Sequence, residues 1–214
     1  MAVYDLEEQE QISELKAWWA QYGTLVTTLA TIAALAAVGW QGWHWYQNRN
    51  AAEASAMYFA VEQAVERQDA QRARDAAGQL IVQQGGTTYA QLGALLAAGL
   101  QFDKGELDNA RAQLEWAADK GKDAALRDLA RLRLAAVLLQ KGEFDAALAR
   151  LEAAPVPSFK ARFADLRGDA LSAQGKPADA RAAYQAALDA LSADDAQATT
   201  LREVVRLKLE SLEG

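Results

Sequence analysis

The sequence predicts an all-α protein, in which a single N-terminal transmembrane helix is followed by a helical-repeat solenoid that ends in a capping helix. The chain of 214 residues is rich in Ala and has only 3 Pro, a composition that favours helices over strands. No Asp, Glu, Lys or Arg lies between Lys16 and Arg49. From Ala51 onward, amphipathic segments alternate with short Gly-containing turns, a pattern typical of helical hairpins.

The composition excludes several classes of protein. A formal net charge of -7 argues against a nucleic-acid-binding protein, which needs a basic face to neutralise phosphates. The chain has no Cys, which excludes disulfides, thiolate zinc sites and cysteine nucleophiles. A single His excludes a metal site built on paired histidines of one chain. We therefore expect no metal, no cofactor and no nucleic acid.

The first element is an acidic tail, residues 1–21, in which five acidic residues outnumber Lys16. The second is an apolar segment, residues 22–46, whose centre at residues 25–39 reads LVTTLATIAALAAVG. With its flanks, the segment reaches the roughly 20 apolar residues that a helix needs to cross a bilayer. Its threonine hydroxyls can bond to carbonyl groups one turn back along the helix. The sequence therefore predicts a transmembrane helix at residues 22–46.

Aromatic side chains mark both ends of this helix, and five of the six Trp belong to them. The predicted membrane-interface residues are Trp18, Trp19, Tyr22, Trp40, Trp43, Trp45 and Tyr46. From Tyr22 to Trp40 is a rise of about 27 Å, which matches the hydrocarbon thickness between two interfacial belts.

Two other interpretations of the apolar segment are weaker. A core helix of a soluble protein has no reason to place indoles at both ends. A cleaved signal peptide is suggested by Ala34-Leu35-Ala36, but the preceding tail is acidic and bulky Trp residues follow. The segment is therefore expected to be a retained anchor. Its orientation stays open, because Lys16 on one side and Arg49 on the other provide no positive-inside bias.

The third element, residues 47–214, contains three similar turns. They read KGELDNA from Lys104, KGEFDAA from Lys141 and QGKPADA from Gln174. Their glycines are 37 and 33 residues apart, which brackets the 34 residues of a tetratricopeptide repeat. Each Gly is expected to end a helix with a positive φ. The sequence therefore predicts a tetratricopeptide-like repeat domain.

The second helix of each repeat has small, large and small residues that allow close packing. These are Ala110, Leu114 and Ala117, then Ala147, Leu151 and Ala154, then Ala180, Tyr184 and Ala187. The repeats are imperfect: Gln101 stands at an apolar packing position, and Pro155 and Pro157 end the second repeat early. A weaker hairpin is expected at residues 54–84. The apolar stripe of residues 201–212 predicts a helix that covers the open end of the stack.

No combination of residues predicts catalysis. His44 lies among aromatic residues with no acidic neighbour to orient it as a base. The Gly85-Gly86 turn lacks the Lys of a phosphate-binding loop. The acidic groups around Asp128 and Asp165 are expected on solvated helix faces, paired with Arg. We therefore expect a protein that is not an enzyme and has no small-molecule substrate.

Repeat arrays of this kind bind partners on the concave surface formed by the first helix of each hairpin. The register of the three turns predicts eight inward-facing candidates for partner binding: Leu92, Leu95, Phe102, Leu132, Leu139, Arg162, Asp165 and Asp169. Some of the leucines are expected to be core residues instead. A partner with exposed apolar residues suits this surface.

The whole chain resembles the YfgM-like ancillary subunits of the bacterial Sec translocon. The resemblance rests on YDLEEQEQ from Tyr4, on LKAWW from Leu15, on Gly39-Trp40, and on ADLRGD from Ala164. It implies a cytoplasmic N-terminus and a periplasmic repeat domain in the inner membrane of a bacterium. It also implies a non-enzymatic adaptor that associates with the translocon, with a membrane-anchored periplasmic chaperone of the prolyl-isomerase type, and with exported client proteins.

A second hypothesis is a scaffold protein of another envelope complex, such as one for cell-wall synthesis or division. Enrichment of a fluorescent fusion at the septum would favour this hypothesis over the adaptor.

Overall fold

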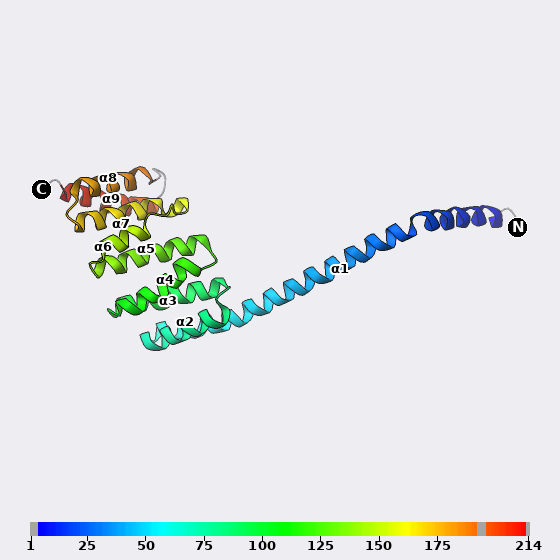
Figure 1. Ribbon diagram of the computed structural model, residues 1–214, viewed down its shortest axis with the longest axis horizontal. Coiled ribbons are helices and arrows are strands. Elements are labelled where there is room, and N and C mark those ends of the chain that lie inside the picture. The colour runs from blue at the N-terminus through cyan, green and yellow to red at the C-terminus, as the bar shows by residue number, and fades with distance from the viewer. Residues whose placement is uncertain (1–3, 192–195, 213–214) are drawn as a thin grey trace. The chain divides into compact units, whose positions relative to one another are not determined.

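The computed structural model describes the backbone of residues 4–191 and 196–212, and the side chains of these residues except for 4–9, 46–48 and 196–197. The chain forms two compact units, Met1–Arg49 and Asn50–Gly214. Within the described residues all regular structure is helical and no strand is present (Figure 1). The predicted all-α fold class is therefore confirmed.

The first helix, α1 (Tyr4–Glu66), is longer than any single element that the sequence predicts. It contains the tail from Tyr4 onward, the apolar segment and the first helix of the earliest hairpin, with no break near residues 21 or 46. The physical reason is that these 63 residues include no Pro and no turn sequence, so nothing in them stops the helix. The junctions between the three segments are changes of polarity within one helix.

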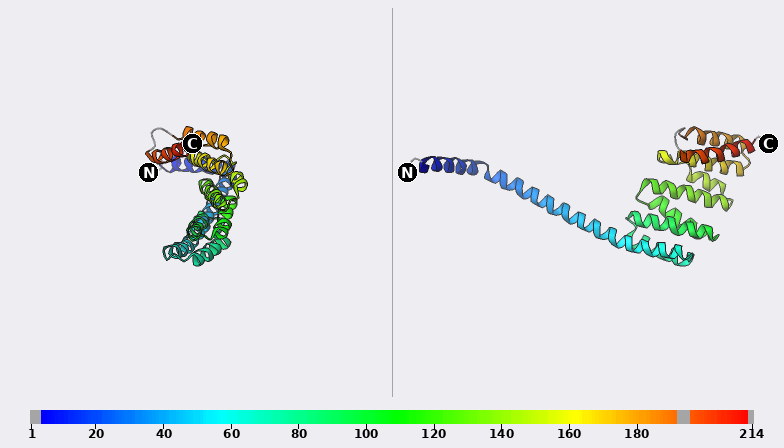
Figure 2. Two further views of the ribbon diagram at one scale, coloured as in Figure 1. Left: turned by 90° about the vertical axis from the view of Figure 1, so that its left-hand side faces the viewer. Right: turned by 180° about the vertical axis from the view of Figure 1, so that it is seen from behind.

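The second unit is a stack of antiparallel helix hairpins, and the left-hand view of Figure 2 shows that the stack curves. The first hairpin pairs the end of α1 with α2, and each later odd-numbered helix pairs with the next even-numbered one until α9. The helices are α2 (Ala70–Gln84), α3 (Thr88–Asp103), α4 (Leu107–Lys120), α5 (Ala124–Gln140), α6 (Phe144–Arg150), α7 (Lys160–Ala173), α8 (Pro177–Asp189) and α9 (Ala196–Ser211), with a 3-10 turn at Pro157–Phe159.

The three predicted turns share one geometry. Gly105, Gly142 and Gly175 have φ values of +76°, +76° and +73°, which L side chains rarely adopt. The residue after each Gly donates its backbone N–H to a carbonyl five residues earlier, at 2.8, 2.9 and 3.0 Å. In the first hairpin Gln68 takes the same role with a φ of +58°. The repeat turns predicted from the sequence are therefore confirmed.

Small residues let the paired helices approach closely. The predicted trios of the first and third repeats are buried throughout. At Gly168 in α7, an added Cβ would lie 2.4 Å from the ring of Tyr184, so only Gly fits there. The middle trio is wrong at Ala154, which is exposed because α6 ends at Arg150. Pro155 and Pro157 follow α6 directly, in agreement with the predicted early end.

An unexpected buried carboxylate holds the chain that follows α6. Asp128 of α5 accepts a hydrogen bond from the backbone N–H of Val156 at 2.8 Å and pairs with Arg131 at 3.0 Å. Only 5% of its side chain is exposed. The prediction of a solvated surface position for Asp128 is therefore wrong, because the backbone of the shortened repeat folds over it.

The helix α9 covers the end of the stack, as predicted. Val205 is fully buried, and Leu201, Leu209 and Leu212 pack against the same cluster, which also contains Leu171 and Tyr184 of the last hairpin. Val204, which belongs to the same predicted stripe, is 41% exposed.

Candidate interaction groove and apolar helix

Two adjoining hollows lie along the first helices of the successive hairpins. The smaller, of about 170 Å³, is lined by α3, α4 and α5 through Ala98, Gly99, Phe102, Asp103, Leu114, Arg133, Ala136 and Val137. The larger, of about 480 Å³, is lined by α5, α7 and α9 through Leu132, Arg133, Ala136, Arg162, Asp165, Leu166, Thr200, Leu201 and Val204. We call the two hollows together the groove.

Arg133 stands at the junction of the two hollows and lines both. Its Nη1 donates a hydrogen bond of 3.1 Å to the backbone carbonyl of Leu95, which holds the guanidinium across the space between α3 and α5. No carboxylate of the described residues lies within ion-pair distance of it. Arg133 is an exposed residue.

Four of the eight predicted partner-binding residues line the groove. These are Phe102, which is 36% exposed, and Leu132, Arg162 and Asp165. Leu95 is only 3% exposed and packs in the core with residues of α4 and α5, so it is one of the candidate leucines that belong to the core and does not line the groove. Leu139 is half-buried against the same core, and Leu92 is half-buried outside the groove.

Asp165 and the eighth candidate, Asp169, bind the capping helix. Lys208 of α9 donates to both carboxylates at 2.8 Å, and the hydroxyl of Tyr184 donates to Asp169 at 2.8 Å. Burial raises the pKa of Asp165 although Lys208 opposes the change. Burial alone would lower the pKa of Lys208, but its bonds to the two carboxylates outweigh this and raise it. The expected Arg partners of these acids are thus replaced by a lysine about 40 residues later in the chain.

Sequence reasoning missed the residues that give the groove its shape. Gly99 and Ala136 open the smaller hollow because they have little or no side chain, and Arg133 connects the hollows. A Gly in the middle of a helix is a sequence signal for such an opening, since it adds no side chain and lowers helix propensity.

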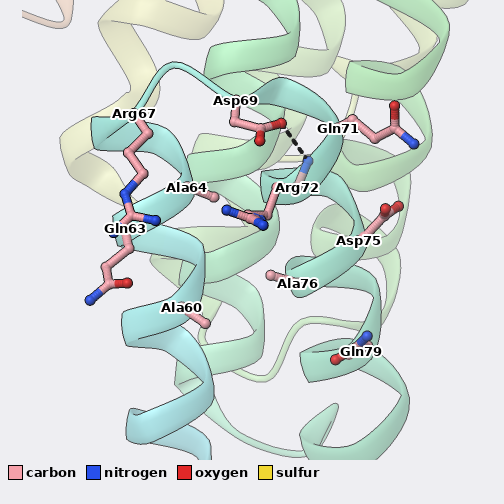
Figure 3. A pocket seen from close by; sticks show the side chains of 10 residues that line it. All are labelled: Ala60, Gln63, Ala64, Arg67, Asp69, Gln71, Arg72, Asp75, Ala76 and Gln79. Carbon is pink, nitrogen blue, oxygen red and sulfur yellow. Dashed lines mark hydrogen bonds between the residues drawn. The ribbon is translucent and has the colours of Figure 1, made fainter.

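A third hollow, of about 650 Å³, lies between the end of α1 and α2 (Figure 3). Its walls carry mostly exposed polar side chains, among them Arg67, Gln71 and Arg72. Asp69 caps α2 there, accepting the backbone N–H of Arg72 at 2.9 Å. We interpret this hollow as the solvated edge of the first hairpin.

The apolar part of α1 is exposed on all its faces. Only 6% of its most apolar 18-residue window is buried, and it is long and apolar enough to cross a membrane. Leu25, Leu35 and Val38 are each at least 60% exposed. This low burial differs from that of a core helix in a soluble protein, which is mostly buried.

Local contacts compensate the polar groups of this segment. The hydroxyls of Thr27, Thr28 and Thr31 donate to carbonyls four residues back at 2.7 to 2.8 Å, as predicted. All six described side chains of the two predicted aromatic belts are between 43% and 65% exposed; the side chain of Tyr46 lies outside the described residues.

The two belts also have internal contacts. The rings of Trp18 and Tyr22 lie 5.8 Å apart, and the guanidinium of Arg49 lies 5.7 Å from the ring of Trp45. His44 packs edge-on against Trp40 at 4.6 Å, in agreement with an interfacial aromatic rather than a base. Within the described residues no cluster of three or more His, Cys, Asp or Glu could hold a metal ion.

Together these features define a helical-repeat protein of the tetratricopeptide type that carries a long apolar helix at its N-terminal end. The family of the tetratricopeptide repeat-like domain matches residues 16–214. The chain is 31% identical over 211 residues to the ancillary SecYEG translocon subunit of Neisseria gonorrhoeae, covering 97% of this chain and 98% of that protein. It is 30% identical over 212 residues to the protein of the same name from Escherichia coli, covering 99% of each.

The protein of that name from Haemophilus influenzae is 30% identical over 184 residues, covering 86% of this chain and 90% of its own length. The chain belongs to the YfgM-like family of tetratricopeptide repeat-like ancillary translocon subunits, as its sequence resemblance predicted.

Proposed function

We propose that this protein is a non-enzymatic adaptor that associates with the Sec translocon at the inner membrane of a bacterium. The observation that carries the proposal is the similarity along nearly the entire chain to proteins named ancillary SecYEG translocon subunits. The apolar segment of α1 anchors the protein, and the groove of the repeat unit binds protein partners. The partners are translocon subunits, a membrane-anchored periplasmic chaperone and exported client proteins.

Site-specific photo-crosslinking in cells tests the adaptor role. A photoreactive residue at Phe102 or Val204, in the groove, is expected to form adducts with translocon subunits or a periplasmic chaperone. Matched positions on second helices, Ala112 in α4 and Gln185 in α8, are exposed and should give few adducts. Adducts from the second-helix positions alone would refute the groove as the partner surface. Adducts with cell-wall or division proteins in place of translocon subunits would support the scaffold hypothesis.

We also propose that the N-terminus is cytoplasmic and the repeat unit periplasmic. Because the chain has no Cys, single cysteines report topology without background. In intact spheroplasts, a membrane-impermeant maleimide should label Val82→Cys, at a side chain that is 84% exposed, and should leave Ser13→Cys unlabelled until the cells are lysed. The reverse pattern would overturn the orientation, and release of a soluble, shortened protein would support cleavage of the apolar segment.

A further inference from the structure

We propose that the groove recognises an amphipathic partner helix in which one acidic residue stands between two apolar residues on the same face. This inference rests on the proposed function, because it names the chemistry of the partner that the groove binds. It follows from the size of the two hollows, their spacing and the charge at their junction.

The smaller hollow has room for one apolar side chain. Its volume of about 170 Å³ is below the roughly 300–1,000 Å³ of pockets that hold drug-sized ligands. Ala98, Gly99 and Ala136 leave it open, and Phe102 and Val137 make its walls apolar. An added Cβ on Gly99 would meet nothing within 4 Å, so the space next to this glycine is unfilled by the protein. A single buried aliphatic or aromatic anchor suits such a hollow.

The larger hollow accepts a second apolar residue. Leu166 of α7 and Leu201 and Val204 of α9 contribute apolar side chains to it, and Val204 is 41% exposed. The capping helix therefore does more than cover the end of the stack, because it supplies one wall of the binding surface.

The charge at the junction favours an anion. Arg133 lines both hollows and is held in place by the carbonyl of Leu95, and Arg162 lines the larger hollow. Of the two acids in the groove, Asp165 shares the ammonium of Lys208 with Asp169, and Asp103 lies at the end of α3. Among the described residues, Arg133 and Arg162 of the groove have no ion-pair partner, and Asp103 is the one carboxylate of the groove without one. The chain as a whole has a net charge of -7. An Arg fork pairs best with a carboxylate.

The spacing of the hollows indicates a helical partner. One hollow lies between α3 and α5 and the other between α5 and α7, and packed helices lie about 8–10 Å apart. On a partner helix, two residues seven positions apart share a face and are separated by about 10.5 Å. A residue three or four positions after the first lies between them on that face, where it meets Arg133.

Peptide binding to the full chain in nanodiscs tests this proposal. The probe is an Ala-based helical peptide with two leucines seven residues apart and a Glu midway, and matched peptides carry Gln or Lys in place of that Glu. Fluorescence anisotropy should show binding of the Glu peptide at least about fivefold tighter than that of the Gln peptide, with the Lys peptide weakest, as for a charge pair that is partly screened from water. Empty nanodiscs measure binding to lipid.

Two variants separate the hollow from the charge. Gly99→Leu fills the smaller hollow and should weaken the Glu peptide by about tenfold or more. Gly78→Leu is its matched control, since Gly78 is also a helical glycine with open space around it but lines no part of the groove. Arg133→Gln should leave the two leucines bound and abolish the difference between the Glu and Gln peptides. Thermal unfolding of each variant shows whether it is folded.

Equal affinity for the three peptides, no binding to the unmodified chain, or full binding to Gly99→Leu would each overturn the proposal. The proposed function is judged separately by whether translocon subunits co-purify with the unmodified chain. Peptide discrimination without co-purification would refute the translocon role and leave the groove chemistry standing. Co-purification without peptide discrimination would refute the groove chemistry and leave the translocon role standing.

Discussion

Two glutamines of the same helix should respond in opposite directions to the same substitution. Gln91 and Gln101 both belong to α3 and both are fully buried. The amide of Gln91 donates to the carbonyls of Ala117 and Asp123 at 3.1 and 3.2 Å and accepts the backbone N–H of Asp123 at 3.0 Å. Neither the nitrogen nor the oxygen of the Gln101 side chain has a hydrogen-bond partner in the described structure.

The magnitudes follow from these contacts. Gln91→Leu removes three hydrogen bonds, one to α4 and two to the turn that follows it, each worth about 0.5–1.5 kcal/mol, so it should destabilise the repeat unit by about 2–4 kcal/mol. Gln101→Leu replaces a buried amide that has no partner by an apolar side chain of similar volume, and it should stabilise the unit by about 1–3 kcal/mol.

Circular dichroism at 222 nm during thermal unfolding of the full chain in detergent micelles measures both effects. At about 2–4 °C per kcal/mol, the Gln101→Leu midpoint should rise by several degrees and the Gln91→Leu midpoint should fall further than that. Peptide binding by the groove reports that the fold is preserved. A fall in the midpoint for Gln101→Leu, or shifts of the same sign for both variants, would refute this account of the core.

The remaining predictions concern the repeat turns and the capping helix. Gly142→Ala forces a side chain into a positive φ and should destabilise the repeat unit by about 1–2 kcal/mol. Gly78→Ala, in the middle of α2, should stabilise the unit by about 0.5–1 kcal/mol. Urea unfolding compares the two variants, and equal shifts of their midpoints would contradict the argument from φ. The pKa of Lys208 is raised in the folded state, so the stabilisation from its bonds to Asp165 and Asp169 is fully present below pH 10.5 and is lost as the pH rises through the folded value. The stability difference between the unmodified chain and Lys208→Met should therefore be constant from pH 7 to 10 and shrink above that range, and a difference that shrank toward pH 8 would refute the assignment.

Features that depend on residues close in the sequence could be predicted well. Gly105, Gly142 and Gly175 each end a helix locally, because a positive φ is a property of one residue and its neighbours. The exposed apolar segment and its aromatic ends are likewise visible in the chain itself. The continuity of α1 through both units was missed because no start or stop signal separates its parts.

The tertiary structure alone decided which side chains of the repeat helices are core and which face the groove. Leu95 and Phe102 are seven residues apart on one helix and were predicted to share a face, yet Leu95 is buried and Phe102 lines a hollow. Leu95 packs in the core with residues of α4 and α5, whereas Phe102 lies beside the smaller hollow. No local pattern encodes these contacts between helices.

Long-range pairing set the remaining features of the site. Asp128 is buried because Val156, 28 residues later, folds over it, and Asp165 faces Lys208, 43 residues away. By itself the sequence determined the helical class, the repeat turns and the apolar segment, since these depend on the chemistry of neighbouring residues. Only packing between distant segments decided the groove, because its two hollows, the bond from Arg133 to the carbonyl of Leu95 and the α9 wall exist where helices from different repeats meet.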